Sequence, residues 1–148
     1  MKFYLLGFFF LVFSFSRVYG QATFQSASGG TWNSASRWTL VSGSDADGIP
    51  DANDNVIIQS GHNVSLSSAN ACNNLTFAGG TIAFNSTITL AIGGNVSVTA
   101  NSNINGYNNN HVFQVAGNLT INSGITLTVG ALNLTINGST TVNGNLSI

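Results

Sequence analysis

NLTF at residues 74–77 is a four-residue sequence motif, called the phrase below, that recurs in similar form toward the end of the chain. The later copies are NVSV at 95–98, NLTI at 118–121, NLTI at 133–136 and NLSI at 145–148. Apolar residues alternate with threonine or serine in each copy, which is the pattern of a strand with one buried face. Turns rich in asparagine, glycine and serine separate the copies, so the sequence predicts many short strands joined by tight turns.

The repetition of this phrase helps to choose between two all-β architectures. Successive copies start 21, 23, 15 and 12 residues apart. Irregular periods are typical of a parallel β-helix, or β-solenoid, because each coil stacks on the previous one and insertions enter the outer turns. The alternative is an antiparallel β-sandwich, which also has short strands but no reason to repeat one phrase. We therefore expect about five coils, with turn asparagines in the left-handed conformation or stacked in ladders.

The expected organisation has three parts. Residues 1–20 are a signal peptide, residues 21–66 are an N-terminal cap with an acidic loop and the first strands, and residues 67–148 are the coils. The last copy of the phrase reaches residue 148 without a capping helix or a charged edge after it. Open strand edges favour end-to-end self-association. We expect the chain to be the N-terminal part of a longer protein, with a truncated reading frame as the alternative.

The leader has the features of an export signal. Lys2 precedes an almost wholly apolar run over residues 3–15, and residues 16–20 are mostly small or polar. The apolar run is too short to span about 30 Å of hydrocarbon as a helix. We expect cleavage after Gly20, or alternatively after Ala22, and a mature protein that has no transmembrane segment and is secreted or held at the outer cell surface.

Charged residues make up 5% of the sequence, against about 25% in typical soluble proteins. Without the leader, Arg37 stands against four aspartates, which gives a net charge of −3 with histidine neutral. A chain without a basic patch is not expected to bind nucleic acid. The single cysteine, Cys72, can form no internal disulfide, and we expect it to be buried.

Two tryptophans, Trp32 and Trp38, lie six residues apart near the start of the mature chain. Large aromatic side chains in a charge-poor domain favour a role in covering the open end of the core. The alternative is a sugar-stacking platform. In that case Trp32 and Trp38 are candidate ligand-binding residues for an extracellular polysaccharide.

All four acidic residues lie within ten positions, at Asp45, Asp47, Asp51 and Asp54. Oxygen-bearing side chains at such short intervals suit a hard cation such as calcium, which takes about six to eight oxygen ligands. The crowding of carboxylates also costs repulsion unless a positive charge offsets it. We therefore expect these four aspartates to bind Ca²⁺, with a solvated loop of aspartate turns as the alternative.

Two resemblances to known families bear on the first half of the chain. Residues 45–55 resemble a single thrombospondin type 3 calcium repeat, although Val56 stands where that family has cysteine. Residues 28–77 resemble the start of the extracellular domain named for its eight glycines, and the β-helix openings of secreted surface proteins of Bacteroidetes-type bacteria. The motifs that carry this second resemblance are Gly30-x-Trp32, Ala35-x-x-Trp38, Pro50, Asp54-x-Val56-x-Ile58, Gly61-His62-x-Val64-x-Leu66 and Cys72-Asn73-Asn74-Leu75-Thr76-Phe77.

The second resemblance implies a right-handed parallel β-helix, extracellular placement and contact with polysaccharide, and it does not imply catalysis. Residues 42–52 depart from it, since this loop is longer and more acidic than in those relatives.

Residue types needed for catalysis are sparse. The chain contains no glutamate, its carboxylates all lie in one loop, and its two histidines are His62 and His111. We expect His62 to be structural and His111 to be exposed in a loop. An acid–base pair for polysaccharide cleavage would have to come from the acidic loop. We therefore expect a non-catalytic secreted or surface module that acts as a scaffold, an adhesin-like stalk or a glycan contact. The alternative is the N-terminal portion of a β-helix polysaccharide lyase or hydrolase.

Overall fold

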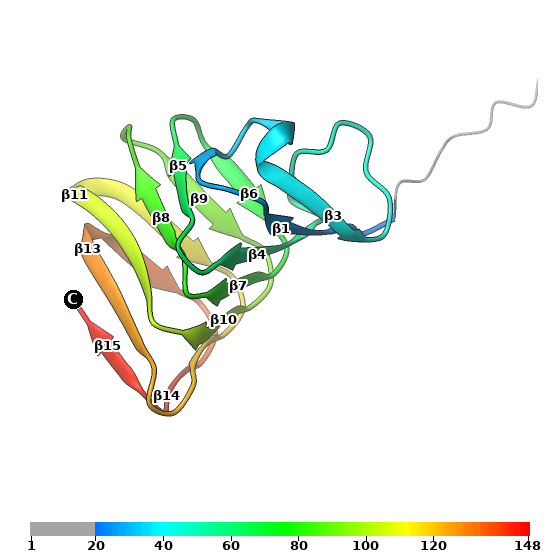
Figure 1. Ribbon diagram of the computed structural model, residues 1–148. Helices are drawn as coiled ribbons and strands as arrows, with labels where there is room; N and C mark the ends of the chain where they lie inside the picture. Colours follow the sequence, from blue (N-terminus) through cyan, green and yellow to red (C-terminus); the bar gives the residue numbers. More distant parts are fainter. Residues whose placement is uncertain (1–19) are drawn as a thin grey trace, which may run out of the picture.

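The computed structural model describes residues 20–148, which are built almost entirely of strands and turns. One short 3₁₀ helix, η1 (Ala35–Arg37), interrupts the strands near the N-terminal end. The expected signal peptide of residues 1–20 lies outside the described residues, apart from Gly20. Figure 1 shows the remaining chain as a stack of strands that begins at β1 and ends at β15.

One sheet collects the first strand of every coil. Its order is β3-β1-β4-β7-β10-β12-β14, and every neighbouring pair except β1 and β3 runs parallel. Its strands are β1 (Thr23–Ser26), β3 (Trp38–Ser42), β4 (Asn55–Gln59), β7 (Leu75–Ala78), β10 (Val96–Ala100), β12 (Leu119–Ile121) and β14 (Thr140–Val142).

The second sheet divides into two rows, because β11 and β13 are long enough to continue around a corner of the coil. One row follows the order β2-β5-β8-β11-β13-β15, and the second halves of β11 and β13 extend the row of β6 and β9. Its strands are β2 (Gly30–Thr31), β5 (Asn63–Leu66), β6 (Asn70–Cys72), β8 (Thr81–Phe84), β9 (Thr89–Ile92), β11 (Ser102–Val115), β13 (Thr126–Ile136) and β15 (Asn145–Ser147).

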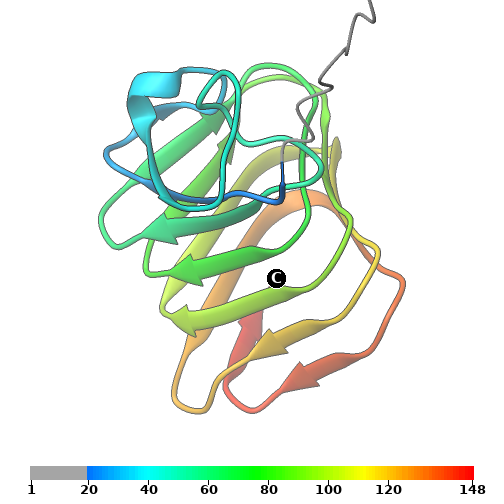
Figure 2. The same cartoon turned by 90° about the vertical axis from the view of Figure 1, so that its right-hand side faces the viewer.

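The parallel pairing of successive coils confirms the predicted β-solenoid, and the alternative antiparallel sandwich is wrong. The complete coils are β4–β6, β7–β9, β10–β11 and β12–β13, so residues 20–148 hold four of them, with partial coils before and after. Figure 2 shows the coils descending in a right-handed sense from the blue end of the chain to the red end.

The repeated phrase explains why about five coils were expected. The copies at 74–77, 95–98 and 118–121 stack on one another in the first sheet, where Leu75, Val96 and Leu119 share one register position. The copy at 133–136 lies instead in the second half of β13, and the copy at 145–148 begins β15. The phrase therefore occurs on every face of the coil, and only some copies mark the start of a coil.

The inward side chains of all faces merge into one core. In β7 and β10, Leu75, Phe77, Val96 and Val98 are buried, whereas the intervening threonine and serine are partly exposed. Burial of each such apolar side chain contributes about 1.5–3 kcal/mol. Since each coil stacks its inner side chains on those of the next, the core lengthens with every coil.

Asparagines form a ladder along the corner that precedes the first sheet. The Oδ1 atoms of Asn74, Asn95 and Asn118 accept the backbone N–H groups of Asn95, Asn118 and Ser139 at 2.8, 2.9 and 2.8 Å. The predicted ladder is confirmed. The predicted left-handed asparagine backbone is wrong, since within residues 20–148 positive φ angles occur only at glycines.

Glycines stack beside this ladder and let the coils approach closely. The N–H groups of Gly117 and Gly138 donate to the carbonyl oxygens of Gly94 and Gly117 at 2.9 and 3.0 Å. A Cβ atom added to Gly117 would lie 2.5 Å from the carbonyl oxygen of Gly94. The other two nearest atoms are Oδ1 of Asn95 at 2.6 Å and the carbonyl carbon of Gly94 at 2.8 Å, so the added atom would clash with backbone and with a side chain of the asparagine ladder.

We expect Gly117→Ala to lower the free energy of unfolding by about 1–3 kcal/mol, the usual cost of forcing extra atoms into a packed region. The measurement is urea denaturation of the chain from Gln21 onward, the expected product of signal cleavage, which is called the mature chain below. Gly93→Ala is the matched control, because its added Cβ would meet only the Cys72 carbonyl oxygen at 3.8 Å. Equal stability of the two variants would show that the coils do not need glycine at this corner.

Candidate functional site

The two tryptophans pack against each other in the N-terminal segment before β4, residues 20–54, which is called the head below. Their ring centroids lie 5.0 Å apart with an interplanar angle of 69°, an edge-to-face arrangement. Trp32 is fully buried and Trp38 is 7% exposed. Neither ring presents a face to solvent, so the structure places both where a core cap belongs rather than where a sugar could stack on them.

Hydrogen bonds from the indole rings fix the loop that follows. Nε1 of Trp32 donates to the carbonyl oxygen of Pro50 at 3.1 Å, and Nε1 of Trp38 donates to the carbonyl oxygen of Trp32 at 2.6 Å. Buried tryptophan N–H groups usually find such partners. The acidic loop is therefore attached to the core at Pro50, between its two pairs of aspartates.

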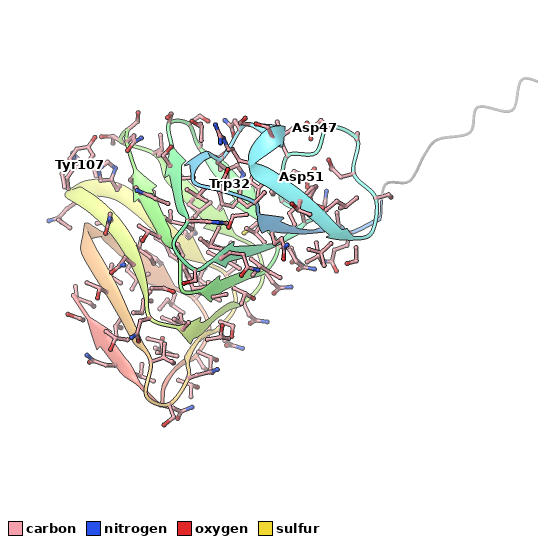
Figure 3. The ribbon with its side chains drawn as sticks, viewed as in Figure 1. Trp32, Asp47, Asp51 and Tyr107 are labelled. Atoms are coloured by element: carbon pink, nitrogen blue, oxygen red, sulfur yellow. The ribbon has the colours of Figure 1, made fainter. Side chains whose placement is uncertain are left out.

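Three of the four aspartates converge. Carboxylate oxygens of Asp45, Asp51 and Asp54 all lie within 4.8 Å of one another, and this set is called the Asp cluster below. Asp47 does not belong to the cluster, although it lies in the same loop (Figure 3). The expected set of four ligands is therefore reduced to three by the geometry.

Asp54 is the buried member of the Asp cluster, with 3% of its surface exposed. Its Oδ1 accepts the N–H of Ala22 at 3.0 Å, and its Oδ2 accepts the N–H of Asp51 at 2.9 Å. Asp54 directly precedes β4, while Ala22 directly precedes β1. One carboxylate thus connects the entry of the first strand, the acidic loop and the first complete coil.

The other aspartates accept hydrogen bonds from their own loop. Oδ1 of Asp45 accepts the N–H groups of Asp47 and Gly48 at 3.0 and 2.6 Å. Oδ1 of Asp47 accepts the N–H of Ile49 at 2.9 Å, and Oδ1 of Asp51 accepts the N–H of Asn53 at 2.7 Å. These are the aspartate turns that the alternative interpretation of the loop expects. They shape the loop and leave further lone pairs on each carboxylate.

The Asp cluster can hold a metal ion. Carboxylate oxygens are the ligands that hard cations prefer, and three carboxylates this close repel one another unless a positive charge lies between them. The Arg37 guanidinium donates instead to Ser28 Oγ at 3.1 Å. A cation bound at the Asp cluster would therefore offset repulsion and stabilise the loop together with the ends of β1 and β4.

Cys72 lies in β6 and is a buried free thiol, as predicted. Burial, with a smaller contribution from the negative charge of Asp54, raises the pKa of Cys72 from 9.0 to about 12. The thiolate is the nucleophilic and metal-binding form of cysteine. Cys72 therefore stays protonated at neutral pH and acts as a small apolar side chain.

The two histidines lie in different surroundings. His62 Nδ1 lies 2.9 Å from Ser26 Oγ, a hydrogen bond between the turn after β4 and the end of β1. His111 is fully buried in β11, and neither of its ring nitrogens has a hydrogen-bond partner. The prediction that His111 is exposed is wrong.

Comparisons with protein-family models, with curated proteins and with solved structures find no match for this chain. The two family resemblances of residues 28–77 and 45–55 therefore stay predictions. Among residues 20–148, no helix has the length and apolar content that crossing a membrane requires.

Sequence reasoning did not separate Asp54 from the other aspartates. A usable signal is its position, since Asp54 directly precedes a strand whose Val56 and Ile58 are buried, and period two places Asp54 on the same inner side.

We expect Cys72 to resist alkylation by iodoacetamide at pH 9 in the native mature chain, where an ordinary thiol is largely reactive. The reason is that burial keeps the thiol protonated and out of reach. Mass spectrometry measures the extent of modification. The same reaction in guanidinium is the control and should go to completion, whereas rapid labelling of the native chain would contradict the buried position.

Proposed function

We propose that the protein is a non-catalytic extracellular β-solenoid module whose head is stabilised by calcium. The observation that carries this proposal is the Asp cluster, in which the buried carboxylate of Asp54 meets Asp45 and Asp51 at the N-terminal end of the stack. Secretion is supported by the export signal over residues 1–20.

The burial of Asp54 favours a bound cation. A carboxylate removed from water is costly unless hydrogen bonds and an opposite charge compensate it. Two backbone N–H groups supply part of that compensation. A cation supplies the rest and also offsets the repulsion from Asp45 and Asp51.

Calcium suits the donor set better than softer metals do. The Asp cluster offers only carboxylate oxygens, whereas zinc sites are commonly built from histidine and cysteine. Three carboxylates supply up to about six oxygens when each is bidentate, and water can complete the coordination shell. The Asp cluster can be reached from solvent, since Asp51 is exposed and Asp45 is partly exposed.

The composition of the coil surface favours binding to a partner over catalysis. From Asn55 to Ile148 the chain has no Asp, Glu, Lys or Arg, and its outward positions are mainly threonine, serine, asparagine and glutamine. Such side chains donate and accept hydrogen bonds without supplying a general acid or base near neutral pH. A scaffold or stalk that displays these rows to a neutral partner fits this composition.

A second function is favoured by the Asp cluster itself. Neighbouring carboxylates with a bound cation are the kind of set that a β-helix polysaccharide lyase or hydrolase requires, so the N-terminal portion of such an enzyme is the alternative. The support from the fold is analogy alone.

We expect calcium to raise the melting temperature of the mature chain by several degrees, as followed by circular dichroism. Calcium at about 100 times its dissociation constant adds about 2.7 kcal/mol to the free energy of unfolding. Asp51→Asn should abolish the shift, because it removes charge from the Asp cluster. Asp47→Asn is the matched control and should keep the shift, because Asp47 lies outside the cluster. Identical melting temperatures in calcium and in EDTA would remove calcium from the proposal.

We expect the mature chain to release no new reducing ends from neutral or anionic polysaccharides, with or without calcium, because its carboxylates shape a loop rather than flank a substrate bond. A reducing-end assay measures this. Cleavage that is lost in Asp51→Asn and kept in Asp47→Asn would favour the enzymatic alternative. Cleavage that survives replacement of Asp45, Asp47, Asp51 and Asp54 together would contradict the non-catalytic role and place catalysis outside the acidic loop.

A further inference from the structure

One aromatic side chain lies on the surface of the coils. Tyr107 is 62% exposed. The other aromatic side chains of residues 20–148 are all buried: Phe24, Trp32, Trp38, Phe77, Phe84 and Phe113. Figure 3 shows Tyr107 at a corner of the solenoid, well apart from the labelled Asp47 and Asp51 of the acidic loop.

The Tyr107 ring packs on two buried rings, those of His111 and Phe84, which lie one behind the other. It packs edge-to-face on His111, with ring centroids 4.3 Å apart at 75°, and His111 packs on Phe84 at 5.4 Å. His111 is fully buried, and neither of its ring nitrogens has a hydrogen-bond partner. Burying unpaired polar atoms lowers the stability of the fold, so an apolar side chain would be more favourable here. The surface ring therefore rests on a packed base that restricts its motion.

The backbone around Tyr107 leaves the ring uncovered. Tyr107 pairs with Ala131 of the next coil, a side chain too short to cover a phenol ring. Val112 lies five residues after Tyr107, whereas their partners Asn133 and Ala131 are only two residues apart. Residues 108–111 therefore form a bulge relative to the coil that follows.

Asparagines lie on both sides of Tyr107 in the sequence. Asn105, Asn109 and Asn110 are exposed, and within the bulge the Oδ1 of Asn108 accepts the N–H of Asn110 at 2.9 Å. Each amide offers two donors and two acceptor lone pairs. Sugar hydroxyl groups are also both donors and acceptors, and the C–H face of a pyranose is complementary to the face of an aromatic ring.

We propose that Tyr107, together with Asn105, Asn109 and Asn110, forms a contact site for a neutral polysaccharide. This site rests on the extracellular role proposed above and lies apart from the tryptophans that the sequence suggested for sugar stacking. A nucleic acid is a poor fit because its phosphates require cations, and residues 55–148 hold no lysine or arginine. A membrane surface is a poor fit because it requires a broad apolar face, whereas the exposed residues close to Tyr107 in the sequence are asparagines.

The test is electrophoresis of the mature chain through native gels that contain mixed-linkage β-glucan, xylan or galactomannan, with EDTA throughout. We expect at least one of these neutral polysaccharides to retard the wild-type chain. Tyr107→Ala should weaken the binding by about tenfold or more, in line with the loss of one stacking contact. Tyr107→Phe keeps the ring and should stay within about threefold of wild type.

Val142→Ala is the control, because it removes an exposed apolar side chain from another strand and should not change the retardation. Circular dichroism checks that each variant is folded. Failure of all three polysaccharides to retard the wild-type chain, or equal retardation of Tyr107→Ala and wild type, would overturn the proposal. A parallel set of gels contains an acidic polysaccharide and calcium in place of EDTA. Retardation seen only in those gels, and lost in Asp51→Asn, would also overturn the proposal and assign binding to the head. Since EDTA is present in the gels with neutral polysaccharides, failure at Tyr107 leaves the calcium result unaffected.

Discussion

The hydrogen bond from each coil to the next sets the register on which the whole molecule depends. Along one corner this bond uses a side chain, as the amide oxygen of Asn95 accepts the backbone N–H of Asn118. The adjacent glycines allow the backbones to meet at the same point. A shift of one residue would turn Leu75 and Phe77 outward and their threonine neighbour inward. The corner therefore fixes which residues become core.

The head caps the N-terminal end of the stack of parallel strands, where backbone groups and core side chains would otherwise be exposed. The free edge of β1 is covered by β3 running antiparallel, so that its backbone groups are paired. The buried pair of Trp32 and Trp38 closes the core below this edge. Asp54 then secures the entry of β1 through Ala22. The same carboxylate takes part in the Asp cluster, so the structural closure and the candidate cation site share one residue.

The fold was predictable because strict alternation, as in Leu75-Thr76-Phe77, forces one face inward whatever surrounds it. The number of coils was not predictable, because copies of the same phrase lie on three different faces. His111 was misassigned from the three asparagines before it, although period two places it in phase with Phe113 and Val115, which are buried. The acidic loop was predicted as a site, but not which three of its aspartates converge. Their convergence depends on the hydrogen bonds from Trp32 to Pro50 and from Ala22 to Asp54, which link distant segments and leave no local sequence pattern.

Because of where its two tryptophans lie, the molecule gives fluorescence and circular dichroism signals that come from different parts of the fold. Both indoles lie in the head, and the four complete coils contain none. Intrinsic tryptophan emission therefore reports the environment of the head alone, while backbone ellipticity is dominated by the strands of the coils. Fraying that starts at β14 and β15 would change the ellipticity and leave the emission constant, whereas loosening around Pro50 would do the reverse. The direction in which the stack melts can thus be read from the order of the two signals, without any added label.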